Sequence, residues 1–244
     1  NFLVFGQLTG NNPFNDRKNT FFTVKWLCEA FQNDKDVGIV IKTNAGRNTL
    51  IDKELVTNTI KQLLIECRKG PYPKVHLLHG DMSDEDVANL YKHKQIKALV
   101  APTRGEGFGL PILEAAASGL PVIATGWSGH MDFMKNGKFI DLYYQLEKIH
   151  HSRVDNNLFM LNSKWANVSE ESFKTKIIKF RNNPSIPKEW AKDLQKIILA
   201  KYNFNEIKSM YELTFGGILN DLCFCCIANH SNNIACAQRK NEHK

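Results

Sequence analysis

Residues 104–119 read RGEGFGLPILEAAASG, and this stretch decides the fold. The preceding segment Ala98–Pro102 is short and apolar, as a buried strand is, and the alanine-rich end of the stretch has the composition of a helix. Pro111 suits the first position of that helix, where its missing N–H costs nothing. The sequence therefore predicts a glycine-spaced loop at the carboxyl end of a strand, followed at once by a helix.

This loop has the features of a site for a phosphorylated sugar compound. Gly105, Gly107 and Gly109 allow the backbone to approach a ligand closely, and the free N–H groups at the start of a helix favour a phosphate. Glu114, one turn into the helix, can accept hydrogen bonds from two adjacent hydroxyls, as a ribose presents them. Glu106 lies in the loop, nearer to the next group of a bound ligand. Together these residues outline a sugar-nucleotide site.

Up to residue 129 the chain alternates short apolar segments with amphipathic ones. We expect strands at Phe2–Gln7, Val37–Thr43, Val75–His79, Ala98–Ala101 and Pro121–Thr125, and helices at Thr20–Gln32, Asp52–Arg68, Ser83–His93 and Pro111–Ser118. This alternation favours an α/β fold, a Rossmann-like parallel sheet with helices on both faces, whose ligands bind beyond the carboxyl ends of the strands. After Gly129 the pattern turns helical, at Ser169–Asn182, Pro187–Lys201 and Asn205–Leu219.

Length and composition narrow the class of protein. A chain of 244 residues with 43% hydrophobic content predicts one large domain, or one domain with an appendage. No apolar run reaches the roughly 20 residues that cross a bilayer, and no secretion signal opens the sequence, so we expect a cytoplasmic protein. The formal net charge of +7 suits an anionic ligand or contact with an acidic membrane surface. Lysine and arginine are scattered rather than clustered with aromatic residues, which argues against nucleic acid.

Metal-binding patterns are weak in this chain. Of the two Asp-x-Asp runs, residues 34–36 precede an expected strand, and residues 84–86 lie in the first turn of a helix that a serine caps. Cys28 and Cys67 lie in amphipathic helical patterns, where cysteine serves as a small core residue. Four more cysteines fall in residues 220–244, and no pair has the spacing of a zinc knuckle. We expect neither a metal nor another cofactor, while acylation or intermolecular bridging of the tail cysteines stays open.

The stretch 104–119 resembles the nucleotide-sugar signature of retaining glycosyltransferases of the GT-B fold, in particular family 4, the "glycosyltransferases group 1" type. The resemblance rests on Glu106 and Glu114, with seven residues between them, and on the GFGLP core. The small-residue helix Ala115–Gly119 and the following strand Pro121–Thr125 complete it.

The resemblance covers about residues 1–219. Gly6 and the run Asp16–Asn19 (DRKN) stand where relatives have a glycine and a basic element that opens the first helix. It implies that residues 1–219 are one half of a GT-B enzyme, the domain that binds the nucleotide sugar, and that residues 220–244 are a cysteine-containing tail. Such an enzyme transfers the sugar with retention of configuration and without a metal. Its acceptor domain would belong to a missing N-terminal part or to a partner chain.

The resemblance also implies roles for individual residues. In the family the second glutamate holds the ribose and the first lies against the donor sugar, which assigns these roles to Glu114 and Glu106. Transfer builds negative charge on the leaving pyrophosphate, and Arg17 and Lys18 supply fixed positive charge after the first strand. We therefore expect Glu106, Lys18 and Arg17 to act in catalysis. Gln7 stands where many relatives have an arginine, which makes the two cations more important.

The other expected donor contacts come from strand ends and from the loop. Lys42 ends the second strand at the same edge of the sheet, although a lysine in such a place is more often exposed. His79 and Gly80 end the third strand, where relatives hold the base by main-chain groups. The full set of expected donor-binding residues is Gly6, Arg17, Lys18, Lys42, His79, Gly80, Gly107, Phe108, Gly109, Leu110 and Glu114.

Two other functions fit the same sequence. A noncatalytic nucleotide-sugar-binding module would bind such a donor and never transfer the sugar. A retaining phosphorylase or an epimerase on the same fold would depend on phosphate, or would hydrolyse the donor without an acceptor. The sequence leaves the base open among UDP-, GDP- and ADP-linked sugars, and it leaves the acceptor open among a sugar, a lipid and a protein.

Overall fold

The computed structural model of the chain describes residues 1–8 and 12–221, and its centre is a six-stranded parallel sheet. The strands lie in the order β3-β2-β1-β4-β5-β6. Their bounds are β1 Phe2–Phe5, β2 Gly38–Thr43, β3 Lys74–His79, β4 Ala98–Ala101, β5 Val122–Thr125 and β6 Ile140–Leu142. Each of the five expected strands is present, as β1 to β5, and the expected Rossmann-like α/β fold is confirmed.

The strand order decides where a ligand can bind. The chain proceeds outward in one direction from β1 through β2 to β3, and then returns to the other side of β1 with β4. The connections after β1 and after β4 therefore diverge and leave a crevice at the carboxyl ends of these two strands. The loop that begins at Gly6 and the loop 102–109 both open into this crevice.

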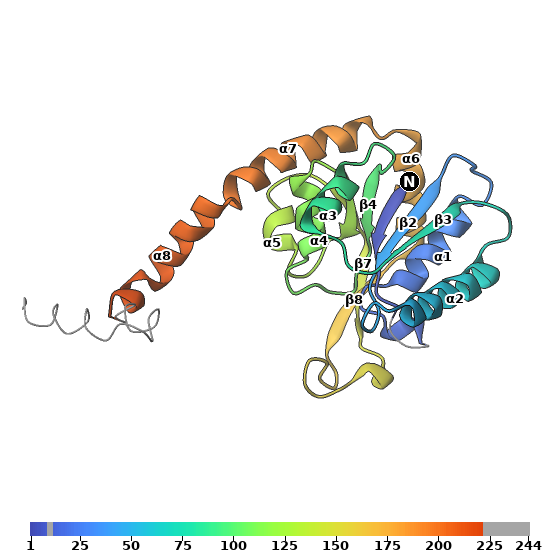
Figure 1. Ribbon diagram of the computed structural model, residues 1–244, viewed down its shortest axis with the longest axis horizontal. Coiled ribbons are helices and arrows are strands. Elements are labelled where there is room, and N and C mark those ends of the chain that lie inside the picture. The colour runs from blue at the N-terminus through green and yellow to red at the C-terminus, as the bar shows by residue number, and fades with distance from the viewer. Residues whose placement is uncertain (9–11, 222–244) are drawn as a thin grey trace, which may run out of the picture. The chain divides into compact units, whose positions relative to one another are not determined.

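Helices cover both faces of the sheet. In Figure 1, α1 (Thr20–Ala30) and α2 (Leu50–Cys67) lie on one side of it, and α3 (Asp84–Lys92) and α4 (Leu110–Ala117) lie on the other. The main apolar cluster joins α1, α2 and α6 (Glu170–Asn182) to the buried side chains of β1, β2 and β4. Burial of these side chains, each worth roughly 1.5–3 kcal/mol, holds the sheet that positions the crevice.

Local sequence explains where several helices begin. Thr49 caps α2, and Ser83 caps α3 as expected, because each accepts a hydrogen bond from a backbone N–H three residues on and each has an aspartate returning the bond. At α4, Gly109 takes φ +86° as the N-cap, and Pro111 occupies the second helical position, one later than expected. Cys28 and Cys67 are buried thiols, in agreement with their expected core role.

The region between residues 130 and 168 differs from the helical pattern expected after Gly129. A short helix, α5 (Met131–Met134), is followed by β6 and then by an antiparallel hairpin of β7 (Tyr144–Lys148) and β8 (Lys164–Val168). The strands were missed because they have only three to five residues each, and much of β7 is exposed, so no sustained apolar alternation reveals them. Figure 1 shows the hairpin extending past the ends of the sheet strands.

The last described helices are α7 (Ser185–Lys201) and α8 (Phe204–Asp221), close to the expected bounds. The described chain divides into one compact unit, residues 1–198, and a second that begins at residue 199. The expected domain limit at residue 219 stays a prediction. The cysteines at positions 223, 225, 226 and 236 lie outside the described residues. Among the described residues, no helix is long and apolar enough to cross a membrane.

Candidate functional site

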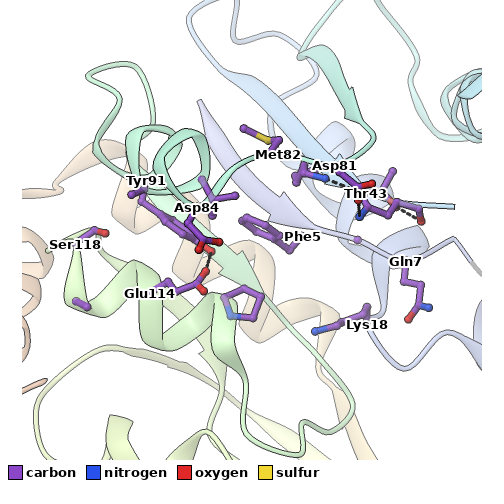
Figure 2. A pocket seen from close by; sticks show the side chains of 17 residues that line it. Phe5, Gln7, Lys18, Thr43, Asp81, Met82, Asp84, Tyr91, Glu114 and Ser118 are labelled. Atoms are coloured by element: carbon purple, nitrogen blue, oxygen red, sulfur yellow. Dashed lines mark hydrogen bonds between the residues drawn. The ribbon is translucent and has the colours of Figure 1, made fainter. Parts of the chain in front are cut away.

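A pocket of about 630 Å³ lies at the carboxyl ends of β1 and β2. Its lining includes four of the expected donor-binding residues, namely Gly6, Lys18, Lys42 and Glu114. Figure 2 shows Glu114 on one side of this pocket, Lys18 and Gln7 on another, and the ring of Phe5 between them. The pocket therefore brings a carboxylate and a cation together around an apolar floor.

Glu114 is held by a residue that the sequence analysis missed. The hydroxyl of Tyr91, on α3, donates a hydrogen bond to Oε2 of Glu114 at 2.9 Å (Figure 2). The Tyr91 ring is buried and stacks on Phe5 with the ring centroids 5.5 Å apart. Burial and the neighbouring carboxylate raise the pKa of Tyr91, so its hydroxyl stays protonated and remains a donor. Oε1 of Glu114 takes no part in this hydrogen bond.

Glu106 lies outside the pocket lining and joins the two expected phosphate-binding cations. Its Oε2 pairs with Nη1 of Arg17 at 2.9 Å, and its Oε1 pairs with Nζ of Lys18 at 2.8 Å. Burial acts to raise the pKa of Glu106, but the charges and hydrogen bonds of Lys18 and Arg17 outweigh it, and the pKa lies below its ordinary value. One buried carboxylate thus holds two cations beside the pocket.

Asp16 orders the segment that carries these cations. Its buried carboxylate accepts hydrogen bonds from the backbone N–H groups of Lys18, which precedes α1, and of Thr20, the first residue of α1. Burial raises the pKa of Asp16 in spite of these bonds. The carbonyl of Arg17 accepts a hydrogen bond from the backbone N–H of Arg104, so the segment is also tied to the loop after β4.

A second loop supports the backbone of Glu106. The Ser128 hydroxyl accepts a hydrogen bond from the Glu106 N–H at 2.8 Å and donates one to the Glu106 carbonyl at 2.7 Å. The N–H of Gly129 donates to the same carbonyl, and a Cβ on Gly129 would overlap the carbonyl oxygen of Gly107. Ser128 has φ +96°, where a side chain is unfavourable.

Lys42 is buried, in contrast to the exposed position that a strand-end lysine commonly has. Its Nζ donates to Oδ1 of Asn44 and to the carbonyl of Gly80, each at 2.5 Å. Burial lowers the pKa of Lys42, an effect that the charge of Asp81 opposes. Lys42 therefore fixes the turn after β3, and its charge lies at the wall of the pocket.

The remaining expected residues lie around the pocket rather than in its lining. The pocket lining contains Asp81 and Met82 in place of the two preceding residues, His79 and Gly80. Phe108 packs on Phe133, and the remaining loop residues outside the lining are Gly107, Gly109 and Leu110. Among residues 1–8 and 12–221, no group of three or more His, Cys, Asp or Glu side chains is arranged to hold a metal ion.

Comparison with known proteins finds a family that part of the chain resembles. Residues 60–148 match the family model described as Glycosyl transferases group 1, and this segment contains both Glu106 and Glu114. The matched segment, residues 60–148, is similar to that family and makes up less than half of the chain. The resemblance stated for residues 104–119 is thereby confirmed.

Other similar proteins extend the match along the chain. A probable sucrose-phosphate synthase of Thermosipho melanesiensis is 26% identical over 168 residues, which make up 67% of this chain and 35% of that protein. The C-terminal domain of LpcC, a group 1 family protein of Francisella tularensis, aligns with a TM-score of 0.52 and 18% identity, over 83% of this chain and 86% of that one. HepE of Anabaena, solved with UDP and glucose, aligns with a TM-score of 0.54 and 16% identity, over 88% of this chain and 47% of that one.

These comparisons define the extent of the likeness. At such identities the solved structures show the fold alone, which is that of the C-terminal half of a GT-B glycosyltransferase. This chain spans about a third of the length of the sucrose-phosphate synthase that it matches.

Proposed function

We propose that this chain is the donor-binding domain of a glycosyltransferase, which takes a sugar from a nucleoside diphosphate sugar and transfers it with retention of configuration. The observation that carries the proposal is the pocket between Glu114 and Lys18, placed where the strand order reverses. A nucleoside diphosphate has two hydroxyls at the ribose and negative charge at the phosphates. The pocket offers one group of matching chemistry for each.

Glu114 is suited to the ribose. Tyr91 occupies one side of its carboxylate, and the free Oε1 and the remaining acceptor capacity of Oε2 can take the two ribose hydroxyls. A base would then extend toward Met82 and Asp81, and the apolar floor of Phe5 lies between the two ends. The phosphates would extend toward Gly6 and Lys18, where the backbone has no side chain in the way.

Arg17, Lys18 and Glu106 are suited to the group transfer. Breakage of the anomeric C–O bond leaves negative charge on the pyrophosphate, and two cations beside it stabilise that charge. Glu106 holds Arg17 and Lys18 in place before a donor binds. A bound diphosphate would share these cations, and Glu106 would then lie near the sugar, as its resemblance to the first family glutamate implies. The two cations supply positive charge without a metal ion.

The donor and its partners are proposed from the relatives. UDP-linked sugars are the first candidates, because HepE was solved with UDP and glucose. Since this chain spans 35% of the relative's length, complete transfer requires the acceptor domain from another segment or another chain. An acceptor sugar, lipid or protein, the cytoplasmic location and contact with a membrane surface remain predictions.

Calorimetry tests the proposal directly. The chain is titrated with UDP, GDP and ADP, each in the presence of excess EDTA, and then with the corresponding sugar nucleotides. We expect saturable binding of one nucleoside diphosphate without a divalent ion. The result that contradicts the metal-free claim is binding that appears only with Mg²⁺ or Mn²⁺, and no binding of any of the three would contradict the donor-binding function itself.

A further inference from the structure

The tip of the β7–β8 hairpin, residues 149–163, contains a turn ordered by hydrogen bonds. None of these residues lines the donor pocket. Oδ1 of Asp155 accepts hydrogen bonds from the N–H groups of Asn157, Leu158 and Phe159 at 2.9–3.0 Å. The N–H of Asp155 donates to the carbonyl of Phe159 at 3.1 Å. The three backbone bonds lower the pKa of Asp155 to about 2, so the carboxylate that orders the turn stays charged.

The turn directs one apolar side chain inward and three outward. Phe159 contacts the ring of Trp165 edge-on at 5.9 Å, and the guanidinium of Arg153 covers its face at 3.9 Å. The outward side chains are those of Leu158, Met160 and Leu161, which are 83%, 52% and 69% exposed. A turn held by its own hydrogen bonds thus exposes three apolar side chains at the loop end of the hairpin. Figure 1 shows the backbone of this loop end.

Lysines lie where the two strands of the hairpin meet this tip. Lys148 and Lys164 are directly opposite each other in the antiparallel register, and both are exposed. Like charges opposite each other destabilise a strand pair, so this arrangement is not explained by the fold. In the part of the chain that the structure describes, neither lysine pairs with a carboxylate. Glu147 precedes Lys148 and therefore lies on the other face of the strand.

We propose that this hairpin tip docks on an anionic lipid bilayer. Leu158, Met160 and Leu161 enter the boundary between headgroups and acyl chains, and Lys148 and Lys164 contact the headgroup phosphates. A bilayer is the occupant that fits this surface. The three apolar side chains are few and exposed and line no groove, and the positive charges of Lys148 and Lys164 lie next to them on the hairpin. An anionic lipid surface offers acyl chains for the first and phosphates for the second. This surface is separate from the donor pocket, so the inference does not depend on the proposed function.

The base of the hairpin is joined to the donor site, which gives the docking a structural consequence. The N–H of Ala166, on β8, donates to the carbonyl of Arg104 at 2.9 Å. Nη1 of Arg104 donates to Oδ1 of Asn167 at 2.9 Å, and its guanidinium lies over the ring of Trp165 at 5.3 Å. Arg104 lies in the loop 102–109, which also contains Glu106. A docked hairpin would therefore orient the donor site with respect to the bilayer.

Co-sedimentation of the purified 244-residue chain with vesicles tests the docking. We expect binding to phosphatidylcholine vesicles that contain phosphatidylglycerol, and weak binding to phosphatidylcholine alone. Lys148→Ala with Lys164→Ala should reduce the partition coefficient about fivefold per lysine, since a basic residue near an anionic surface is worth about 1 kcal/mol. Leu158→Ser with Leu161→Ser should reduce binding at least about tenfold, and added salt should weaken wild-type binding.

Leu50→Ser with Leu55→Ser is the matched control, because these α2 side chains are 84% and 61% exposed and lie outside the hairpin. It should bind vesicles as the wild type does. A second measurement places a fluorophore by Leu158→Trp, whose emission should shift to the blue and be quenched by lipids brominated in the acyl chain.

Three results would overturn the proposal. In the first, the wild type stays in the supernatant. In the second, the control loses as much binding as the hairpin variants. In the third, brominated lipids leave the emission of the Leu158→Trp variant unchanged. Nucleotide titration of every variant keeps the two claims apart, because lost nucleotide binding would concern the donor site alone.

Discussion

The two glutamates of the motif should respond differently to the loss of charge. The perturbation is Glu114→Gln in one variant and Glu106→Gln in the other, because glutamine keeps the shape and removes the negative charge. Glu114 lines the pocket and keeps Oε1 free, whereas Glu106 lies outside the lining with both oxygens paired to cations. A free nucleoside diphosphate should therefore depend on Glu114 and hardly on Glu106.

The structure allows the magnitudes to be compared. Loss of a charged hydrogen-bond acceptor costs roughly 1.5–3 kcal/mol, which is about one to two decades of affinity for the Glu114 variant. For Glu106 two effects oppose each other. If a bound phosphate lay about 7 Å from this carboxylate, removing the negative charge would relieve about 2 kcal/mol of repulsion at an effective dielectric constant of about 20. Arg17 and Lys18 would lose the Glu106 carboxylate as their common partner. The lost ion pairing and the greater disorder of the two side chains cost a similar free energy. The net change for the Glu106 variant should stay within about 1 kcal/mol.

Calorimetry with free UDP and with a UDP sugar measures both values. We expect the Glu114 variant to lose affinity for both ligands and the Glu106 variant to lose affinity only for the sugar nucleotide. Circular dichroism verifies that both variants are folded. Equal losses of UDP affinity in the two variants would refute the assignment of the ribose to Glu114.

Four further outcomes follow from the same contacts. Tyr91→Phe keeps the ring stacked on Phe5 and removes the hydrogen bond to Glu114. The affinity for UDP should fall about five- to tenfold, and the affinity for 2′-deoxy-UDP should fall less. An equal loss for both ligands would indicate that Tyr91 has a packing role alone. Lys18→Ala should weaken UDP at least about tenfold and leave uridine unaffected, as paired titrations would reveal. The pKa of Glu106 is depressed in the folded state, so its stabilising effect is present above its ordinary pKa of about 4.3 and is lost as the pH falls through the lower folded value. The melting temperatures of wild type and Glu106→Gln should therefore differ at about pH 7 and converge only once the pH has fallen below that folded value. The isolated chain should bind the donor with negligible transfer, and multiple turnovers on a panel of sugar and lipid acceptors would place the acceptor site within these 244 residues.

Much of the fold follows from patterns that are local in the chain. Short apolar runs mark β1, β2, β4 and β5, and a serine or threonine followed three residues later by an aspartate marks the beginning of α2 and α3. These features involve residues within one turn or one strand, and their chemistry is complete without any distant partner. The hairpin β7–β8 lacked such a signal, because each of its strands has only five residues of mixed polarity and β7 is largely exposed.

The sequence by itself determined the parallel sheet, the glycine loop before α4 and the presence there of two glutamates with seven residues between them. Only the tertiary structure decided what these groups touch. Arg17 and Lys18 reach Glu106 across nearly ninety residues, Tyr91 reaches Glu114 from another helix, and Lys42 is buried because the turn after β3 closes over it. The physical reason is that such contacts depend on the order in which the strands pair. That order brings distant segments to one edge of the sheet, and no local pattern of residues encodes it.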